Sequence, residues 1–189
     1  MNYAPKLAAR AQELFPNHPY REHFAAFECR ARYRSELIGT DGKPGLPQTL
    51  ACVRRYLRDF PNGRYRDELE WLGVRLEHWT YEFEGDPEPA LRQAHAFESY
   101  LEQRPKHERR SEIELRIAYL YYLAQEFISE KDEGAEAFPA ADAGTYRARA
   151  EAIYARLSNA TDPAVAAEAR IQLFNLREGR RISVNANKW

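Results

Sequence analysis

Side chains that commonly catalyse reactions or bind metals are sparse in this 189-residue chain, and their spacing matches no familiar site. His23 and Cys29 lie six residues apart on one predicted helix, too far round it to act as a base and its nucleophile. The chain contains no phosphate-binding glycine loop, no GxGxxG and no GxSxG turn. We therefore expect no catalytic residue, no metal site and no cofactor. No HExxH motif and no pair four residues apart occurs among the five histidines, His18, His23, His78, His95 and His107.

The acidic pairs and the two cysteines have simpler structural explanations. Asp67 and Glu68 fit the start of a helix, where the helix dipole favours negative charge, and the acids at 133–136 fit a charged loop. Cys29 and Cys52 lie on different predicted helices and form no CxxC motif. We expect them to be two small buried apolar residues, with a disulfide or a reactive thiol as the alternatives.

Composition and charge exclude several classes of partner. Hydrophobic residues make up 44% and charged residues 30% of the chain, as is ordinary for a soluble globular protein. The net charge is −1, whereas binding to nucleic acid or to anionic membranes usually involves a basic excess. No apolar run reaches the roughly 18 residues of a membrane span, and residues 1–6 lack a hydrophobic signal core. We expect no nucleic-acid partner, no direct membrane insertion and a cytoplasmic protein as written; a fragment without its signal or anchor would be periplasmic.

One stretch recurs along the chain and organises it. Residues 57–69 contain a Phe-Pro-Asn-Gly sequence, an earlier copy occupies residues 14–22, and a degraded copy occupies residues 100–108. The copies are 45 and 44 residues apart, and recurrence at a fixed period is typical of repeat arrays.

Each copy is expected to form a corner between two helices. Pro61 ends the incoming helix, because proline lacks an N–H and disfavours helical geometry in the residue before it. Asn62 and Gly63 tolerate turn conformations, and Asp67 and Glu68 suit the first turn of the next helix. The pattern therefore predicts an antiparallel helix pair in each repeat.

Apolar residues recur at three- and four-residue steps through most of the chain. In the first helix these positions are Leu7, Ala8, Ala11 and Leu14, and in the second they are Phe24, Phe27, Ala31 and Ile38; we expect these residues to be buried. Eight helices, alternately short and long, are expected at about 5–14, 19–38, 47–60, 64–83, 87–103, 108–129, 145–157 and 163–178.

The fold expected from these helices is all-α, because no run alternates with the period of a strand. We predict a right-handed α-α solenoid over residues 1–179, followed by a tail or linker at 180–189. Residues 131–144 break the repeat period and are predicted to be an inserted loop, with a short helical piece within it as the alternative.

A second motif supports a family resemblance. A Leu-Gly pair at 72–73 is followed by Gly-Asp-Pro at 85–87 and Ala-Leu at 90–91, and Pro105 closes the unit. This unit resembles the tetratricopeptide repeat (TPR). Its longer helices and its Phe-Pro-Asn corner are similar to the repeats of bacterial lipoproteins of the outer-membrane assembly and Tol-associated type. The resemblance implies a TPR-like solenoid in a bacterial protein, with the long helices lining a concave face.

A groove on that concave face is the predicted binding site. The long helix at 64–83 and the matching positions of the other long helices would form an acidic groove with an aromatic end, which suits a peptide with basic and apolar residues. The alternative is that the acids form an ordinary solvated face and the tyrosines belong to the core. The predicted partner-binding residues are Asp67, Glu70, Val74, Glu77 and His78, together with Arg32, Tyr33, Glu114, Tyr121 and Tyr122.

The function expected from these features is a non-enzymatic scaffold that binds a protein or peptide, including another domain of its own polypeptide. One alternative is a structural spacer or self-association module, with a homodimer formed by the apolar helix at 108–129 or by the tail around Trp189. Another is an enzyme or enzyme regulator with a site between the 131–144 loop and the groove.

Overall fold

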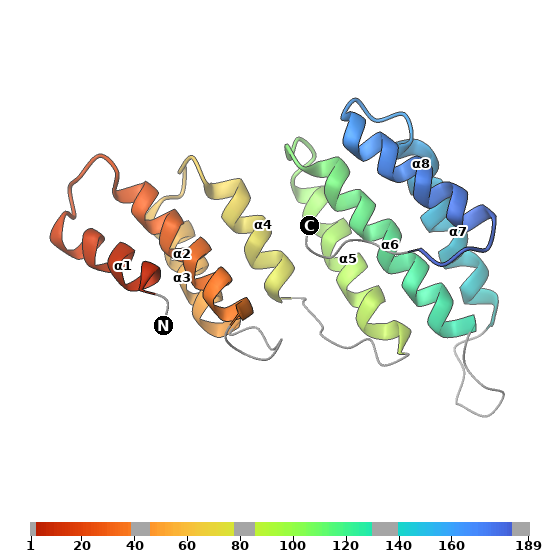
Figure 1. Cartoon of the computed structure of the whole chain (residues 1–189), viewed down its shortest axis with the longest axis horizontal. Helices are drawn as coiled ribbons and strands as arrows, with labels where there is room; N and C mark the ends of the chain where they lie inside the picture. The colour runs from red at the N-terminus through yellow and green to blue at the C-terminus, as the bar shows by residue number, and fades with distance from the viewer. Residues whose placement is uncertain (1–2, 39–45, 78–85, 130–139, 183–189) are drawn as a thin grey trace. The chain divides into compact units, whose positions relative to one another are not determined.

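The computed structural model describes residues 3–38, 46–77, 86–129 and 140–182, and this part of the chain contains eight helices and no strand (Figure 1). The predicted all-α class is therefore confirmed for the described residues. The first four helices belong to one compact unit, Met1–Trp79, and the last four to another, Thr80–Trp189. The helices are α1 (Ala4–Leu14), α2 (Arg21–Ile38), α3 (Leu46–Asp59), α4 (Arg66–Glu77), α5 (Pro87–Gln103), α6 (Arg110–Ser129), α7 (Ala140–Leu157) and α8 (Pro163–Arg177).

The three copies of the recurring stretch form the same backbone turn. In the second copy, the N–H of Gly63 donates to the carbonyl of Phe60 (3.0 Å), and the N–H of Arg66 donates to the carbonyl of Gly63 (3.1 Å). The prediction that these stretches are corners before a new helix is therefore confirmed. The same two bonds join His18 to Phe15 and Arg21 to His18 in the first copy, and His107 to Arg104 and Arg110 to His107 in the third.

Two further helix starts follow the predicted combination of an aspartate and a proline. The side chain of Asp86 accepts from the N–H of Glu88 (3.0 Å) at the start of α5. Asp162 does the same for Ala164 (2.8 Å) at the start of α8. Both carboxylates satisfy N–H groups that have no partner within the helix.

The start of α7 differs from the prediction. The helix begins at Ala140, so residues 140–144 of the predicted loop are helical, and residues 130–139 lie outside the described part. The alanines at the start of α7 favour helical geometry. A Cβ at Gly144 would meet nothing within 4 Å, so Gly144 does not allow a close approach of another helix.

The core of the first unit is built from small residues of α2 packed against α3 and α4. Ala26 and Cys29 are fully buried, whereas Phe27, a predicted core residue, is 50% exposed. On α1 the residues that face the core are Pro5 and Ala8, whereas Leu7 and Leu14 are exposed. The predicted apolar sides were therefore right for Ala8 of α1 and Ala31 of α2, which are buried, and wrong for Leu7, Leu14 and Phe27.

Two contacts bring the helices of this unit close together. A side chain at Gly73 would lie 3.2 Å from Val53 Cγ1, which confirms the predicted close approach of α4. Cys29 and Cys52 form a disulfide between α2 and α3, with their Cα atoms 5.4 Å apart. The two cysteines are buried as expected, but the prediction that they are unbonded apolar residues was wrong, and the disulfide alternative holds.

The core of the second unit is centred on α6, which is buried on most of its sides as predicted. Ile113, Leu120 and Ala124 are each 1% exposed or less. α6 packs against both α5 and α7, and α7 packs against α8. Beyond α8, the side chain of Ile182 is buried and its N–H donates to Tyr122 Oη (3.1 Å), so the start of the predicted tail is held on α6. None of the described helices combines the length and apolar character needed to cross a membrane.

Candidate functional site

The corner between α3 and α4 is fixed by a polar network around the buried side chain of Tyr56. Glu22 Oε1 accepts from Tyr56 Oη (2.7 Å) and from the N–H of Tyr65 (3.3 Å). That N–H also lies 3.1 Å from Tyr56 Oη. Burial, together with the hydrogen bond to Glu22, raises the pKa of Tyr56 above its usual range. These side chains hold the turn and are not free for a ligand.

A second network joins α1, α2 and α3 around a carboxylate that has no solvent exposure. Glu28 accepts from Arg32 Nε (2.9 Å), Arg55 Nη2 (2.6 Å) and Gln12 Nε2 (2.8 Å). Burial alone would raise the pKa of Glu28, but the hydrogen bonds from Arg55 and Arg32 and the charge of Arg55 outweigh it and hold the pKa low. Arg32, a predicted partner-binding residue, is therefore engaged in a structural ion pair.

The predicted acids of α4 are only partly available to a partner. Asp67 is exposed. Glu70 forms an ion pair with Arg66 (3.5 Å), and Glu77 forms one with Arg54 of α3 (2.7 Å). Neighbouring arginines thus offset two of the three negative charges expected to recognise a basic peptide.

The other predicted residues of the first unit lie among different neighbours. Val74 is half-buried on α4. Tyr33 packs against the core, and the guanidinium of Arg75 lies 5.2 Å from the centre of its ring. His78 lies outside the described residues.

Glu114 belongs to the second unit and is 7% exposed. It accepts from Arg110 of α6 (3.0 Å) and from Arg156 of α7 (2.8 Å), so its charge is neutralised by two arginines. These residues line a pocket of about 410 Å³ whose wall holds three arginines and three glutamates. Because the charges balance, the pocket favours neither an anion nor a cation.

Tyr121 and Tyr122 belong to the core, as the alternative interpretation expects. Tyr121 has no exposed surface, stacks on Tyr146 with ring centres 5.8 Å apart, and accepts from Arg149 Nη1 (3.0 Å). Burial raises the pKa of Tyr121 to about 12. Tyr122 is 3% exposed and accepts from the N–H of Ile182. Neither ring is available at the surface of this unit.

The apolar surface that sequence reasoning missed lies on α1 and the corner after it. Tyr3, Leu7 and Leu14 are 62%, 68% and 55% exposed, and their spacing puts them on one side of α1. We call these three residues the α1 stripe. Phe15 and Tyr20 extend the exposed apolar surface into the corner. The signal was present in the sequence as the apolar spacing of α1, but it was assigned to the core.

Among the described residues, no group of three or more histidine, cysteine, aspartate or glutamate side chains is placed to hold a metal ion. Comparison with protein-family models and with curated proteins gave no match for this chain. Geometry is therefore the basis for choosing between surfaces. It favours the exposed α1 stripe over the predicted groove, whose acids are largely paired and whose tyrosines are buried.

Proposed function

We propose that this chain is a non-enzymatic helical-repeat module that binds an amphipathic helix of a partner protein on the α1 stripe. The proposal includes a TPR-like solenoid of antiparallel helix pairs, supported by the recurrence of one corner geometry at 45 and 44 residues. The observation that carries the binding function is the α1 stripe itself. Exposed apolar patches of this kind often mark contacts with other proteins.

The spacing of the stripe favours a helix as the partner. Its side chains recur at helical steps, and an amphipathic helix presents a complementary row of apolar residues. Lys6 and Arg10 are exposed beside the stripe, and among the described residues Arg10 pairs only with Glu13, both side chains being more than 60% exposed. A partner helix with acidic residues beside its apolar row would therefore fit best.

The first test is a photo-cross-linking residue at Leu7, with the same residue at Arg58 as the control. The side chain of Arg58 is 72% exposed and lies away from the stripe on α3. We expect Leu7 to capture a partner through a segment with apolar residues at helical spacing, and Arg58 not to capture it. Capture of the same protein from both positions would contradict the proposal.

The second test uses the captured segment as a synthetic peptide and measures its affinity for the purified chain. Leu7→Glu/Leu14→Glu should weaken binding by about tenfold or more, because each leucine contributes apolar contact area. Arg58→Glu should leave the affinity unchanged. Both substitutions are at exposed sites and should change the stability by no more than about 0.5 kcal/mol. Equal affinity of all three proteins would overturn the proposal.

The same experiment separates the self-association alternative. If Leu7 cross-links to a second copy of this chain, the α1 stripe is a homodimer contact. Sedimentation should then show a dimer for the wild type and a monomer for Leu7→Glu/Leu14→Glu.

A further inference from the structure

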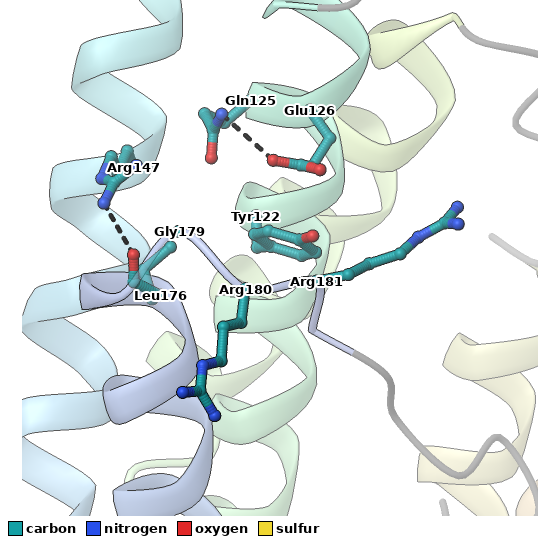
Figure 2. A pocket seen from close by; sticks show the side chains of 8 residues that line it. All are labelled: Tyr122, Gln125, Glu126, Arg147, Leu176, Gly179, Arg180 and Arg181. Atoms are coloured by element: carbon teal, nitrogen blue, oxygen red, sulfur yellow. Dashed lines mark hydrogen bonds between the residues drawn. The ribbon is translucent and has the colours of Figure 1, made fainter.

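A small polar pocket lies in the second unit where α6, α7 and the segment after α8 meet (Figure 2). Its volume is about 280 Å³, close to the lower end for ligand pockets. It is separate from the α1 stripe, which belongs to the other unit. The residues that decide its chemistry are Tyr122, Gln125, Glu126, Arg147 and Arg181.

Gln125 offers this pocket a hydrogen-bond acceptor that has no partner among the described residues. The side chain is 8% exposed, and its Nε2 donates to Glu126 Oε1 and to Ser129 Oγ (both 3.3 Å). Because the Glu126 carboxylate can only accept, the amide nitrogen must face it and the amide oxygen must face away, and the Ser129 hydroxyl can accept from the same nitrogen. Oε1 has no hydrogen-bond partner among the described residues, and Figure 2 shows it directed into the space between Arg147 and Tyr122. A buried carbonyl oxygen of this kind favours a ligand that donates an O–H or N–H.

Arg147 offers a positive charge on the other side of the same space. Its Nη2 donates to the backbone carbonyl of Leu176 (2.6 Å), and no carboxylate pairs with it within the described ranges. Glu126, the one acid in the lining, accepts from Gln125. Arg180 and Arg181 point away from the centre of the pocket in Figure 2 but add positive charge at its edge. The pocket therefore favours an anion.

The remaining wall is held in place by the chain after α8. Tyr122 Oη accepts from the N–H of Ile182, whose side chain is buried. The backbone N–H of Arg180 donates to the carbonyl of Asn175 (2.8 Å), and its guanidinium lies 5.1 Å from the centre of the Phe174 ring. These contacts preform the pocket, so a ligand need not order it.

We propose that this pocket binds a small carboxylate that carries an O–H or N–H donor on the neighbouring carbon. The carboxylate pairs with Arg147, and the donor bonds to Gln125 Oε1. Free 2-hydroxy or 2-amino acids have this chemistry, and so does the C-terminal residue of a peptide.

The test is an NMR titration of the full chain with three probes: lactate, N-acetylglycine and propanoate. Propanoate has the carboxylate but lacks the donor. We expect lactate or N-acetylglycine to shift the backbone amide signals of Gly179 and Arg181 and to bind about fivefold or more tightly than propanoate. The tighter of the two identifies the source, a free hydroxy acid or a peptide end. Equal affinities for all three probes, or no shift at these signals, would overturn the proposal.

Substitutions then assign the two roles. Arg147→Gln should abolish the shifts with every probe, and Gln125→Met should remove the advantage over propanoate while leaving propanoate binding. Arg170→Gln is the matched control, because Arg170 is exposed on α8 and donates to the carbonyl of Ser158 outside the pocket. If Gln125→Met fails to fold, Arg147→Gln alone decides, since Arg147 is only half-buried and tolerates substitution more readily. Shifts that persist in Arg147→Gln or disappear in Arg170→Gln would overturn the assignment.

Discussion

At the scale of the residue, each corner has one backbone N–H that needs an acceptor, two positions after residue 18, 63 or 107. These N–H groups belong to Tyr20, Tyr65 and Arg109. In the first and third corners a histidine provides the acceptor, with Nδ1 of His18 and His107 accepting at 3.2 Å and 3.1 Å. The second corner has Gly63 at this position, and Tyr56 Oη accepts from Tyr65 instead. Two chemically different solutions therefore support one backbone geometry.

Gly63→Ala should destabilise the protein by about 1–3 kcal/mol. A Cβ at this position would lie 2.6 Å from Tyr56 Oη and 2.8 Å from Glu22 Oε1, so the network of the corner would have to move. Urea unfolding measures the loss. Gly144→Ala is the control, since its Cβ would meet nothing within 4 Å and it should be neutral or stabilising by up to about 1 kcal/mol. Equal effects of the two substitutions would contradict the role of the corner network.

Glu28 should make the stability of the protein depend on pH in the acid range. Its folded-state pKa is lower than its ordinary value of 4.5, so the unfolded chain binds the proton more readily. The contribution of Glu28 is therefore present above pH 4.5 and is lost as the pH falls through its folded-state pKa. Urea unfolding between about pH 3 and 7 should show a shallower acid loss for Glu28→Gln than for the wild type.

The control for this pH dependence is Glu88→Gln. The side chain of Glu88 is 60% exposed and pairs with Arg92 on the surface of α5, so its removal should leave the acid slope unchanged. If Glu28→Gln lost stability in acid as steeply as the wild type, the prediction would be contradicted.

At the scale of the element, α2 is joined to α3 by chemistry of two kinds. The Cys29–Cys52 disulfide links the helices through the core, and Arg55 Nη2 reaches both Glu28 and Cys52 Sγ (3.7 Å). The disulfide and the ion pair of Glu28 thus lie next to each other. Loss of either one removes a constraint on the same pair of helices.

Reduction of the disulfide should destabilise the first unit. For cysteines 23 residues apart, the entropy of the unfolded loop corresponds to about 3 kcal/mol. Thermal unfolding with and without a reductant measures the effect, and the Cys29→Ala/Cys52→Ala variant is the control that should not respond. The folded protein should contain no free thiol among these cysteines, as alkylation followed by mass spectrometry would show. Two alkylated cysteines in the folded oxidised protein would contradict the prediction.

At the scale of the whole molecule, 28 basic and 29 acidic residues nearly cancel. Within each unit, several acids of the predicted groove are already paired, including Glu70, Glu77 and Glu114. Binding through the α1 stripe therefore depends mainly on burial of apolar surface, whereas binding through an acidic groove would depend on unpaired charge.

Salt should therefore have only a modest effect on the affinity for the partner peptide. Between about 0.05 and 0.5 M NaCl the dissociation constant should rise by no more than about fivefold, because apolar contacts are not screened and only the exposed charges of Lys6 and Arg10 are. Glu70→Lys/Glu77→Lys is the matched variant and should bind as the wild type does. A steep loss of affinity with salt, or a loss in this variant alone, would move recognition to the acidic groove.

The sequence was sufficient for features that depend on neighbouring residues. The helix starts at Asp86 and Asp162 and the corner at Gly63 follow from local chemistry, in which a side chain or turn acts on the backbone within three residues. The buried character of α6 was likewise predictable, because its apolar residues cover most of the helix. These features yielded the helical class, the element order and the recurring corner.

Only the tertiary structure decided which face of each helix is buried and which side chains are paired. Leu7, Ala8 and Leu14 all have the spacing of core residues, yet among them only Ala8 is buried, together with Pro5. Cys29 forms a disulfide with Cys52, 23 positions away, and Glu114 pairs with Arg156, 42 positions away. No local sequence pattern encodes either contact. The physical reason is that apolar spacing gives an amphipathic helix its period, whereas the helices packed against it determine which side is covered.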